Sequence, residues 1–497
     1  MRFAKILSVA TLPMFLFACS DSNSGNYVNN PGAENPPEEQ PNDSIPKKIP
    51  DEELKPIARD YSLVWQGQGT AESPFLITNE QDLSSLAFYV NDSSMTFKGN
   101  FFKLTADIAL TKAWSPIGIF GKNALGYGNR VFSGSFDGAS KTISGLTISD
   151  TAAYSGLFGL VRGGTISNVV IKDAKMNVGS VAGVLAGLAD SVTVENCTID
   201  NAEVKGADRV GGLVGEAKNV TVTNVSVTGS VSGTNNIGGA LGSVLNGVLT
   251  NLTNSATVSG KSTVGGVVGG SSSVSGESSI TSALNYGAVS GSKDVGGVIA
   301  TLSSTKLEKS GNYGAVTADE NQISTVGGVV AVASNKSSVN EVFNTATVTV
   351  KKVQAAGGVI GNLKAVTATN LFNQGEVSGQ ASKIGGLVGI VDNDAKLESG
   401  YNSAKVPDNN FSGTVAGKVN SSATITNVYY DKTVSGDCSD PAKCLAIAES
   451  MGVSSPTGFA TEEMKSSTFV ATLNGAGAVW SIDPAKFGGY PSFSWAK

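Results

Sequence analysis

The stretch VGGLVG at Val210–Gly215 would be a poor β-strand on its own, because two adjacent glycines remove side-chain packing and increase the entropy lost on ordering. Related hexamers nevertheless recur along the chain as IGGALG, VGGVVG, VGGVIA, VGGVVA, AGGVIG and IGGLVG. Counted from the apolar residue that opens each hexamer, the copies start at Tyr154, Val181, Val210, Ile237, Val264, Val295, Val326, Ala356, Ile384 and, in degenerate form, Val415. Nine intervals of 27 to 31 residues predict a solenoid.

A second apolar run follows within each period, as in TVTNVSVTGSVSG, TSALNYGAVSG and TATNLFNQGEVSG. These runs are rich in valine, threonine and isoleucine and show no helical periodicity. Short strands of this kind cannot bury both faces alone, but parallel stacking at ~4.8 Å lets every coil bond to its neighbours around one core. We therefore predict an all-β fold, a right-handed parallel β-helix (a solenoid) of about ten coils with N- and C-terminal caps. The paired glycines mark either a corner or a tightly packed face of each coil.

One asparagine recurs just before the last strand of successive repeats, at Asn254, Asn285, Asn312, Asn344, Asn373 and Asn402. Stacked at the strand spacing, the amides of these residues would bond to one another as a structural ladder. The alternative is that each asparagine suits its own turn, because the residue favours turns.

Both ends of an open β-helix expose strand edges, which predicts caps. TNEQDLSSLAFYVND predicts a helix that begins at Thr78 or Asn79 and whose apolar face is formed by Leu83, Leu86, Ala87 and Val90. Near the C-terminus, TEEMKSSTFVATLN predicts a further helix. An aromatic tail follows it, for which we expect a role in covering the last coil, with a carbohydrate platform as the alternative; its rings are Trp480, Tyr490, Phe493 and Trp495.

The N-terminal sequence MRFAKILSVATLPMFLFACS has a basic start and an apolar run that is short for a membrane span and typical of a secretory signal. It ends in LFAC (Leu16–Cys19), which resembles the lipobox of bacterial lipoproteins. That resemblance implies cleavage before Cys19 and lipidation of this residue, and several acyl chains would anchor the protein stably in a membrane. The alternative is an ordinary signal peptide that ends in Ala-Cys.

The region after Cys19 contains seven of the fifteen prolines among polar residues, a composition that predicts an extended, disordered stalk. We accordingly expect five regions: a signal peptide over 1–18, the lipidated cysteine and stalk over 19–60, an N-terminal cap and entry to the solenoid over 61–150, the repeats over 151–437, and a C-terminal cap over 438–497.

Composition excludes several classes of function. The formal net charge is −6 and there are five arginines, none after Arg209, which argues against a nucleic-acid partner. The chain has no histidine, which removes Ser-His and Cys-His nucleophiles and every histidine metal site. We expect no cofactor and no metal.

The three cysteines other than Cys19 predict structure and no chemistry of their own. Cys438 and Cys444 flank CSDPAKC in a chain that we expect to leave the cytosol, which favours a local disulfide over two unpaired thiols. Cys197, in VENCTID, is predicted to be a buried strand thiol.

Many β-helices are polysaccharide lyases or hydrolases, which need close carboxylates, or carboxylates with calcium and a base. The tightest acidic pair is Asp392 with Asp394, and Asp319 with Glu320 is another. Both pairs fall where turns are expected, so solvated turn residues explain them. Lys351 and Lys352 are the remaining candidates for the basic residue of such a site. The sequence therefore favours a protein that is not an enzyme.

Several segments together resemble the family of bacterial surface proteins built on the GLUG motif: Gly67–Ile77, Leu104–Leu110, WSPIG at Trp114–Gly118, Phe132–Ile148, GLFG at Gly156–Gly159, the repeated GG-x-[VL]-G, NVYYD at Asn427–Asp431, and the terminal GGYPSFSW. The resemblance covers nearly everything after the stalk. It implies a β-helix displayed at the bacterial surface, in a family that includes adhesin-like proteins and the non-catalytic region of secreted immunoglobulin A peptidases. The zinc motif of those peptidases is missing here.

These observations favour a monomeric rod that is lipid-anchored in the bacterial cell envelope. We expect it to face outward from the outer membrane and to bind a glycan, cell wall or extracellular protein through a long polar surface. The alternatives are a polysaccharide-processing enzyme and a passive spacer. A binding role predicts a non-uniform face with exposed aromatic residues, whereas a spacer predicts polar faces all round.

Overall fold

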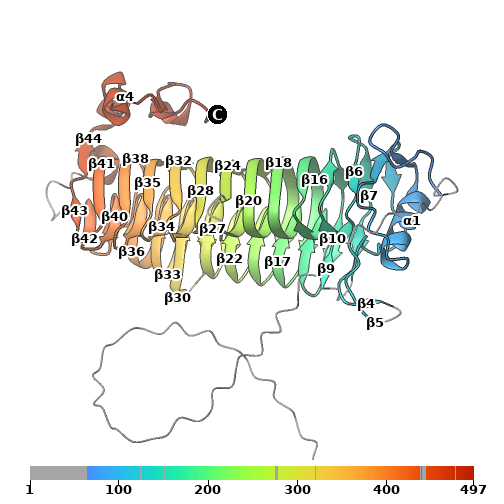
Figure 1. The fold of residues 1–497 in the computed structure, drawn as a ribbon. Coiled ribbons are helices and arrows are strands. Elements are labelled where there is room, and N and C mark those ends of the chain that lie inside the picture. The colour runs from blue at the N-terminus through green and yellow to red at the C-terminus, as the bar shows by residue number, and fades with distance from the viewer. Residues whose placement is uncertain are drawn as a thin grey trace, which may run out of the picture. The chain divides into compact units, whose positions relative to one another are not determined.

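The computed structural model describes residues 64–496 apart from 124–125, 150–152, 275–277, 320, 437, 439–443 and 476. The predicted signal peptide, Cys19 and the stalk lie outside the described residues. The rest forms a β-solenoid of about 13 turns in which parallel strands stack coil on coil (Figure 1).

One coil illustrates the arrangement. Its strands β22 (Ser262–Gly265), β23 (Val268–Ser272), β24 (Ser278–Asn285) and β25 (Val289–Gly291) each pair in parallel with the equivalent strand of the next coil. Those partners are β26 (Lys293–Gly296), β27 (Ile299–Ser303), β28 (Thr305–Asn312) and β29 (Val316–Ala318). Val264, Val268 and Val289 point inward and are at most 1% exposed, so consecutive coils share one apolar core.

The stack is longer than the ten coils expected. It begins at β1 (Phe75–Ile77), which pairs with β2 (Phe101–Leu104), and β2 pairs with β6 (Ser135–Asp137). At the other end β42 (Ile447–Ser450) and β44 (Thr457–Phe459) pair with the coil before them. The first region was expected to be a cap and the entry to the solenoid, and the last was expected to be a cap. They lack the glycine pair that marks the other coils, so counting hexamers missed them.

The strand register also corrects three of the repeat positions. Val210 pairs with Ala182, and Ala182 pairs with Ser155, so the first two copies start one residue later than Val181 and Tyr154. The degenerate copy starts at Ser412, which pairs with Ile384, and not at Val415. In all three copies a small residue occupies the opening position, where the other copies have an apolar one, and this obscured the alignment.

The glycine pairs lie on a tightly packed inner face. A Cβ on Gly297, the second glycine of its pair, would collide with the Asn312 amide and with the carbonyl of Gly328 in the next coil. Gly266 stands in the same relation to Asn285, and Gly328 to Asn344. The second glycine is therefore required because it leaves room for the asparagine across the coil.

The six asparagines form a continuous buried ladder. Each donates its Nδ2 to the Oδ1 of the next at 2.8–2.9 Å, from Asn254 to Asn402. Within its own turn, Asn312 also donates to the Gly314 carbonyl at 2.8 Å and accepts from the Gly314 N–H at 3.2 Å. All six side chains are 0% exposed, so the amides satisfy buried backbone groups and link coils at the same time.

The N-terminal helix agrees with its prediction. Helix α1 (Glu80–Asn91) is capped by Asn79, whose Oδ1 accepts from the Asp82 N–H at 3.0 Å. Its apolar face is buried against the first coils through Leu83, Leu86, Ala87 and Val90.

The C-terminal region departs from prediction in two ways. The expected single helix is two, α3 (Thr461–Met464) and α4 (Ser467–Asn474), because the Ser466 hydroxyl caps a new helix by accepting from the Phe469 N–H at 3.2 Å. The aromatic tail does not act as a plug for the last coil: residues 461–496, the C-terminal clasp, turn back along the side of the stack (Figure 1).

The clasp covers a column of outward-facing rings from three successive coils, Phe343, Phe372 and Tyr401. Phe493 lies 5.3 Å from Phe372 between ring centroids, and Trp480 lies 5.7 Å from Tyr401. Indole N–H groups fix the position, Trp480 donating to Asn370 at 3.2 Å and Trp495 to Glu341 at 2.8 Å. An uncovered column of three large rings would be an exposed apolar patch, which is why the clasp lies on the side of the rod.

We predict that Asn312→Ala destabilises the solenoid by roughly 2–4 kcal/mol, because it removes the partner of the Gly314 N–H and carbonyl and one ladder bond from each neighbouring amide in a dry core. Urea denaturation followed by circular dichroism measures this. The matched control is Asn393→Ala, at an exposed turn asparagine outside the buried ladder, which we expect to cost about 1 kcal/mol or less. Equal losses in the two variants would contradict a structural role for the buried ladder.

We predict that Phe493→Ala loosens the clasp without unfolding the rod, because Phe493 is 1% exposed and contacts rings from both the clasp and the stack. Loss of such a ring costs about 3–5 kcal/mol. Trypsin should then cleave faster at Lys465 and Lys486, while the β-sheet circular dichroism stays unchanged. An unaltered cleavage rate would show that the clasp does not depend on this ring.

Candidate functional site

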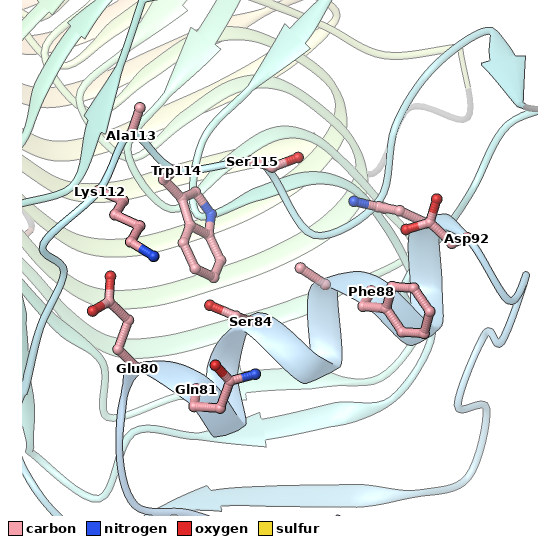
Figure 2. Close-up of a pocket in the computed structure, with 11 residues that line it drawn as sticks. Glu80, Gln81, Ser84, Phe88, Asp92, Lys112, Ala113, Trp114 and Ser115 are labelled. Atoms are coloured by element: carbon pink, nitrogen blue, oxygen red, sulfur yellow. The ribbon is translucent and has the colours of Figure 1, made fainter.

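A cleft lies between helix α1 and the segment around Trp114. The outer face of α1 contributes Gln81, Ser84 and Phe88, and the opposite wall is the stretch Lys112–Ser115 (Figure 2). The Trp114 indole is fixed from below, because its Nε1 donates to the Leu157 carbonyl at 3.0 Å and its backbone N–H donates to Thr147 at 2.9 Å.

The two walls are tied together at both ends of the helix. At the start, the Glu80 carboxylate accepts from the N–H and the hydroxyl of Thr111 at 2.8 and 2.7 Å, and these bonds lower the pKa of Glu80. At the end, Asn91 donates to the Pro116 carbonyl and accepts from the Gly118 N–H, both at 2.9 Å. The middle turn has no such tie, which leaves a hollow of about 410 Å³.

The lining of the cleft combines rings with varied polar groups. Phe88, 55% exposed, supplies most of the aromatic surface, and Trp114, 8% exposed, supplies a small part of it. Around them stand an amide (Gln81), the Lys112 ammonium and the Asp92 carboxylate, and Figure 2 shows the side chains of Lys112 and Glu80 extending toward each other. A few polar groups around aromatic surface, in a hollow of this size, are typical of small-ligand sites.

Sequence analysis identified both walls without bringing them together. The helix was predicted from its periodicity, and WSPIG was one of the segments that carried the family resemblance. Gln81 and Phe88 were not candidates, because both are ordinary residues for the exposed face of a helix. The sequence held one signal of the cleft: Phe88 is a large aromatic residue that lies outside the apolar stripe of the helix.

Three cysteines lie among the described residues, for which a disulfide and a buried thiol were predicted. Cys438 and Cys444 form a disulfide. Cys197 is 1% exposed in strand β16 (Thr193–Lys205), and burial raises the pKa of its thiol to about 12, so it stays protonated and inert at neutral pH.

Three of the four acids considered for catalysis lie among the described residues. Asp392 accepts from the Asn420 amide at 2.6 Å, and Asp394 is an exposed turn residue with φ 60°. Asp319 lies 3.5 Å from the Lys351 ammonium at an open surface, and Glu320 lies outside the described residues. None of these residues lines the cleft beside α1.

A second asparagine ladder was missed by sequence analysis. Asn168, Asn196, Asn224 and Asn251 sit at one corner with φ between 54° and 57°, a left-handed conformation that asparagine tolerates. Each donates to its equivalent in the preceding coil at 2.9–3.3 Å, starting from the Asp137 carboxylate. The asparagines' fixed spacing was a detectable signal.

The most strongly perturbed exposed carboxylate is structural. Glu449 of the last coil accepts a hydrogen bond from Lys383 and another, at 2.8 Å, from Lys418 of the two preceding coils. These two bonds, that of Lys383 first, lower the pKa of Glu449 to about 2. The arrangement ties the terminal coil to the stack.

These features define a class of protein: a parallel β-solenoid locked by stacked asparagines, with a cleft beside its first coils. Within the described segments, no helix has the length and hydropathy for a membrane crossing, and no three histidine, cysteine or acidic side chains gather as a metal site.

Comparison with known proteins adds little to this class. No family model matches the chain. Halomucin from Haloquadratum walsbyi is 35% identical over 131 residues, which is 25% of this chain and 1% of the length of halomucin. A crystal structure described as a candidate immunoglobulin A1 protease from Bacteroides ovatus shares 15% identity, covering 87% of this chain and 95% of its own, with a TM-score of 0.28. A score this low supports no argument about function.

We predict that Glu449→Gln flattens the acid side of the stability profile. The pKa of Glu449 lies below its unfolded value of 4.5, so the carboxylate stabilises the fold above pH 4.5 and that contribution is lost as the pH falls toward 2. Urea midpoints at pH 7, 4 and 2.5 measure the difference between variant and wild type. Glu376→Gln, at another exposed glutamate, is the control and should follow the wild-type profile; a wild-type profile for Glu449→Gln would contradict the prediction.

Proposed function

We propose that this protein is a lipid-anchored, non-catalytic rod that is displayed at the bacterial surface and binds glycans. The lipobox-like LFAC and the proline-rich stalk support anchoring through Cys19. The resemblance to GLUG-motif surface proteins supports display. The solenoid itself supplies stiffness, since each coil is fixed to its neighbours by strand pairing and by the buried ladder.

The observation that carries the proposal is the composition of the cleft beside α1. A sugar ring has an apolar face of C–H groups and a rim of hydroxyls, so it needs aromatic surface and several hydrogen-bonding groups. Phe88 offers the first, with a small exposed part of Trp114, and Gln81, Lys112 and Asp92 offer the second. A volume of about 410 Å³ suits a mono- or disaccharide unit at the end of a longer glycan.

Binding is favoured over cleavage by the state of the acids in the cleft. Glycoside hydrolysis needs two carboxyl groups at opposite sides of one bond, one as acid and the other as base or nucleophile. Glu80 is committed to Thr111 by two hydrogen bonds, which lower its pKa, whereas a general acid needs a raised one. The carboxylate that remains, Asp92, is at the far end of the helix in Figure 2.

We predict that the full chain, purified in mild detergent, is retained by a subset of an immobilised glycan panel and releases no sugar product. Phe88→Ala combined with Gln81→Ala should reduce this affinity at least about tenfold, because the cleft loses one aromatic wall and its amide. Calorimetric titration with the retained glycan measures the affinity, and reducing-end analysis of the same samples detects any product.

Phe411→Ala is the matched control, because Phe411 is 56% exposed against 55% for Phe88 and is remote from the cleft lining. It should bind like wild type. If no glycan is retained, the role of a passive spacer is favoured. If sugar product is released, the protein is a polysaccharide-processing enzyme.

A further inference from the structure

Two exposed tyrosines stack on one outer face of the solenoid, away from the cleft. The rings of Tyr286 and Tyr313, in adjacent coils, are parallel, with an interplanar angle of 0° and centroids 4.8 Å apart. Tyr286 is 45% exposed and Tyr313 is half-buried. Most of the other outward positions on these coils carry serine, threonine or lysine, so the pair is a local departure from the polar surface.

The fold does not require tyrosine at this position. Each tyrosine directly follows a rung of the buried asparagine ladder, and strand register aligns the rungs from coil to coil. The equivalent position in other coils is filled by Ser255, Thr345, Gln374 and Ser403. A coil therefore closes with a small polar residue there, and packing does not explain the two rings.

The tyrosines lie beside the ring column that the clasp covers, two residues further along their coils. Tyr313 meets Phe343 edge-to-face at 5.2 Å, and Phe343 lies 5.7 Å from Trp495 of the clasp. Trp495 is itself only half-buried, and its Nε1 is fixed by Glu341. Tyr286 and Tyr313 thus form an aromatic ledge that adjoins the clasp through the buried ring of Phe343.

The clasp shows which kind of group packs on the ring column. Over the neighbouring coils it lays flat rings whose edges make hydrogen bonds, as with Trp480 on Phe372 and Tyr401. The uncovered ledge is much smaller. Two partly exposed rings present on the order of 200 Å², well below the ~800 Å² per partner of a stable protein interface. The ledge therefore suits a flat, ring-sized ligand with a polar rim.

We propose that the aromatic ledge is a second glycan-contacting site, which stacks the apolar face of a neutral pyranose on the Tyr286 ring; this inference rests on the proposed glycan-binding function. Tyrosine hydroxyls supply donors and acceptors at the rim. Burial raises the pKa of Tyr313 to about 12, so its hydroxyl stays protonated at neutral pH. With the cleft, the ledge makes one rod bivalent toward a single long polysaccharide or a dense glycan layer.

The test uses the full chain in detergent and four neutral hexasaccharides, built from glucose, galactose, mannose and N-acetylglucosamine, in calorimetric titrations. The key variant is Tyr286→Ser with Tyr313→Thr, since both new residues occur at this position in neighbouring coils and should leave the fold intact. We expect wild type to bind at two sites and the variant at one. Adding the Phe88→Ala and Gln81→Ala changes should abolish the remaining site.

Two further variants test the mechanism of stacking. Tyr286→Phe keeps the ring and should bind within about twofold of wild type. Ser255→Tyr adds a third ring to the pair and should tighten binding severalfold. A ring-preserving variant that loses the site, or no gain from Ser255→Tyr, would overturn stacking as the basis of the ledge.

The outcomes separate the two proposals. If Tyr286→Ser with Tyr313→Thr binds like wild type, while the cleft variant loses all binding, the ledge is overturned and the proposed function stands. If wild type binds none of the hexasaccharides or the panel glycans, both proposals fail. The inference would also be overturned if extracellular-matrix proteins bind the wild type but not Tyr286→Ser with Tyr313→Thr, and glycans do not show this difference. The ledge would then bind a protein partner.

Discussion

Each coil of this solenoid lies one strand spacing, ~4.8 Å, from the next, so every side chain has its own counterpart as a neighbour. That constraint selects residues that can touch copies of themselves. Asparagine can, because its amide is both donor and acceptor, and flat rings can by stacking, as Phe343 and Phe372 do at 4.9 Å and 6°. Carboxylates cannot, because like charges repel. Acids on the stack meet cations of adjacent coils instead, as Asp190 meets Arg162 at 3.1 Å.

The same constraint made much of the fold predictable. The hexamers and the Asn254–Asn402 series recur because they are contacts between equivalent residues, and period alone therefore indicates parallel stacking. The helix over Glu80–Asn91 was predictable for a local reason, its cap and its apolar stripe. The repeat period could not show that the glycine pairs and the asparagine ladder are in contact. The second glycine leaves room for the asparagine across the coil, and this contact depends on how each coil closes.

The features that sequence analysis missed depend on contacts between distant, non-equivalent segments. The clasp returns to Phe343 from more than a hundred residues away, and no periodic signal marks which outward rings it will cover. The first and last coils lack paired glycines, so they were assigned to caps. The cleft joins a helix to WSPIG through Glu80–Thr111 and Asn91–Gly118, bonds that neither segment reveals alone. Its position was thus unpredictable even though both walls were recognised.

A repetitive rod has little chemistry along its regular faces, because a residue that suits one coil must suit the next. Specific recognition then depends on positions where the repeat is broken. The cleft exists because α1 and the Trp114 segment are not part of the repeat, and the ledge exists because tyrosine replaces a small polar residue in two successive coils. One tyrosine alone would lie loose on the surface; two in register hold each other flat, since the stacking that serves asparagine and phenylalanine serves tyrosine as well. The solenoid therefore contributes to binding by pre-ordering the rings, which lowers the entropy lost when a ligand stacks on them.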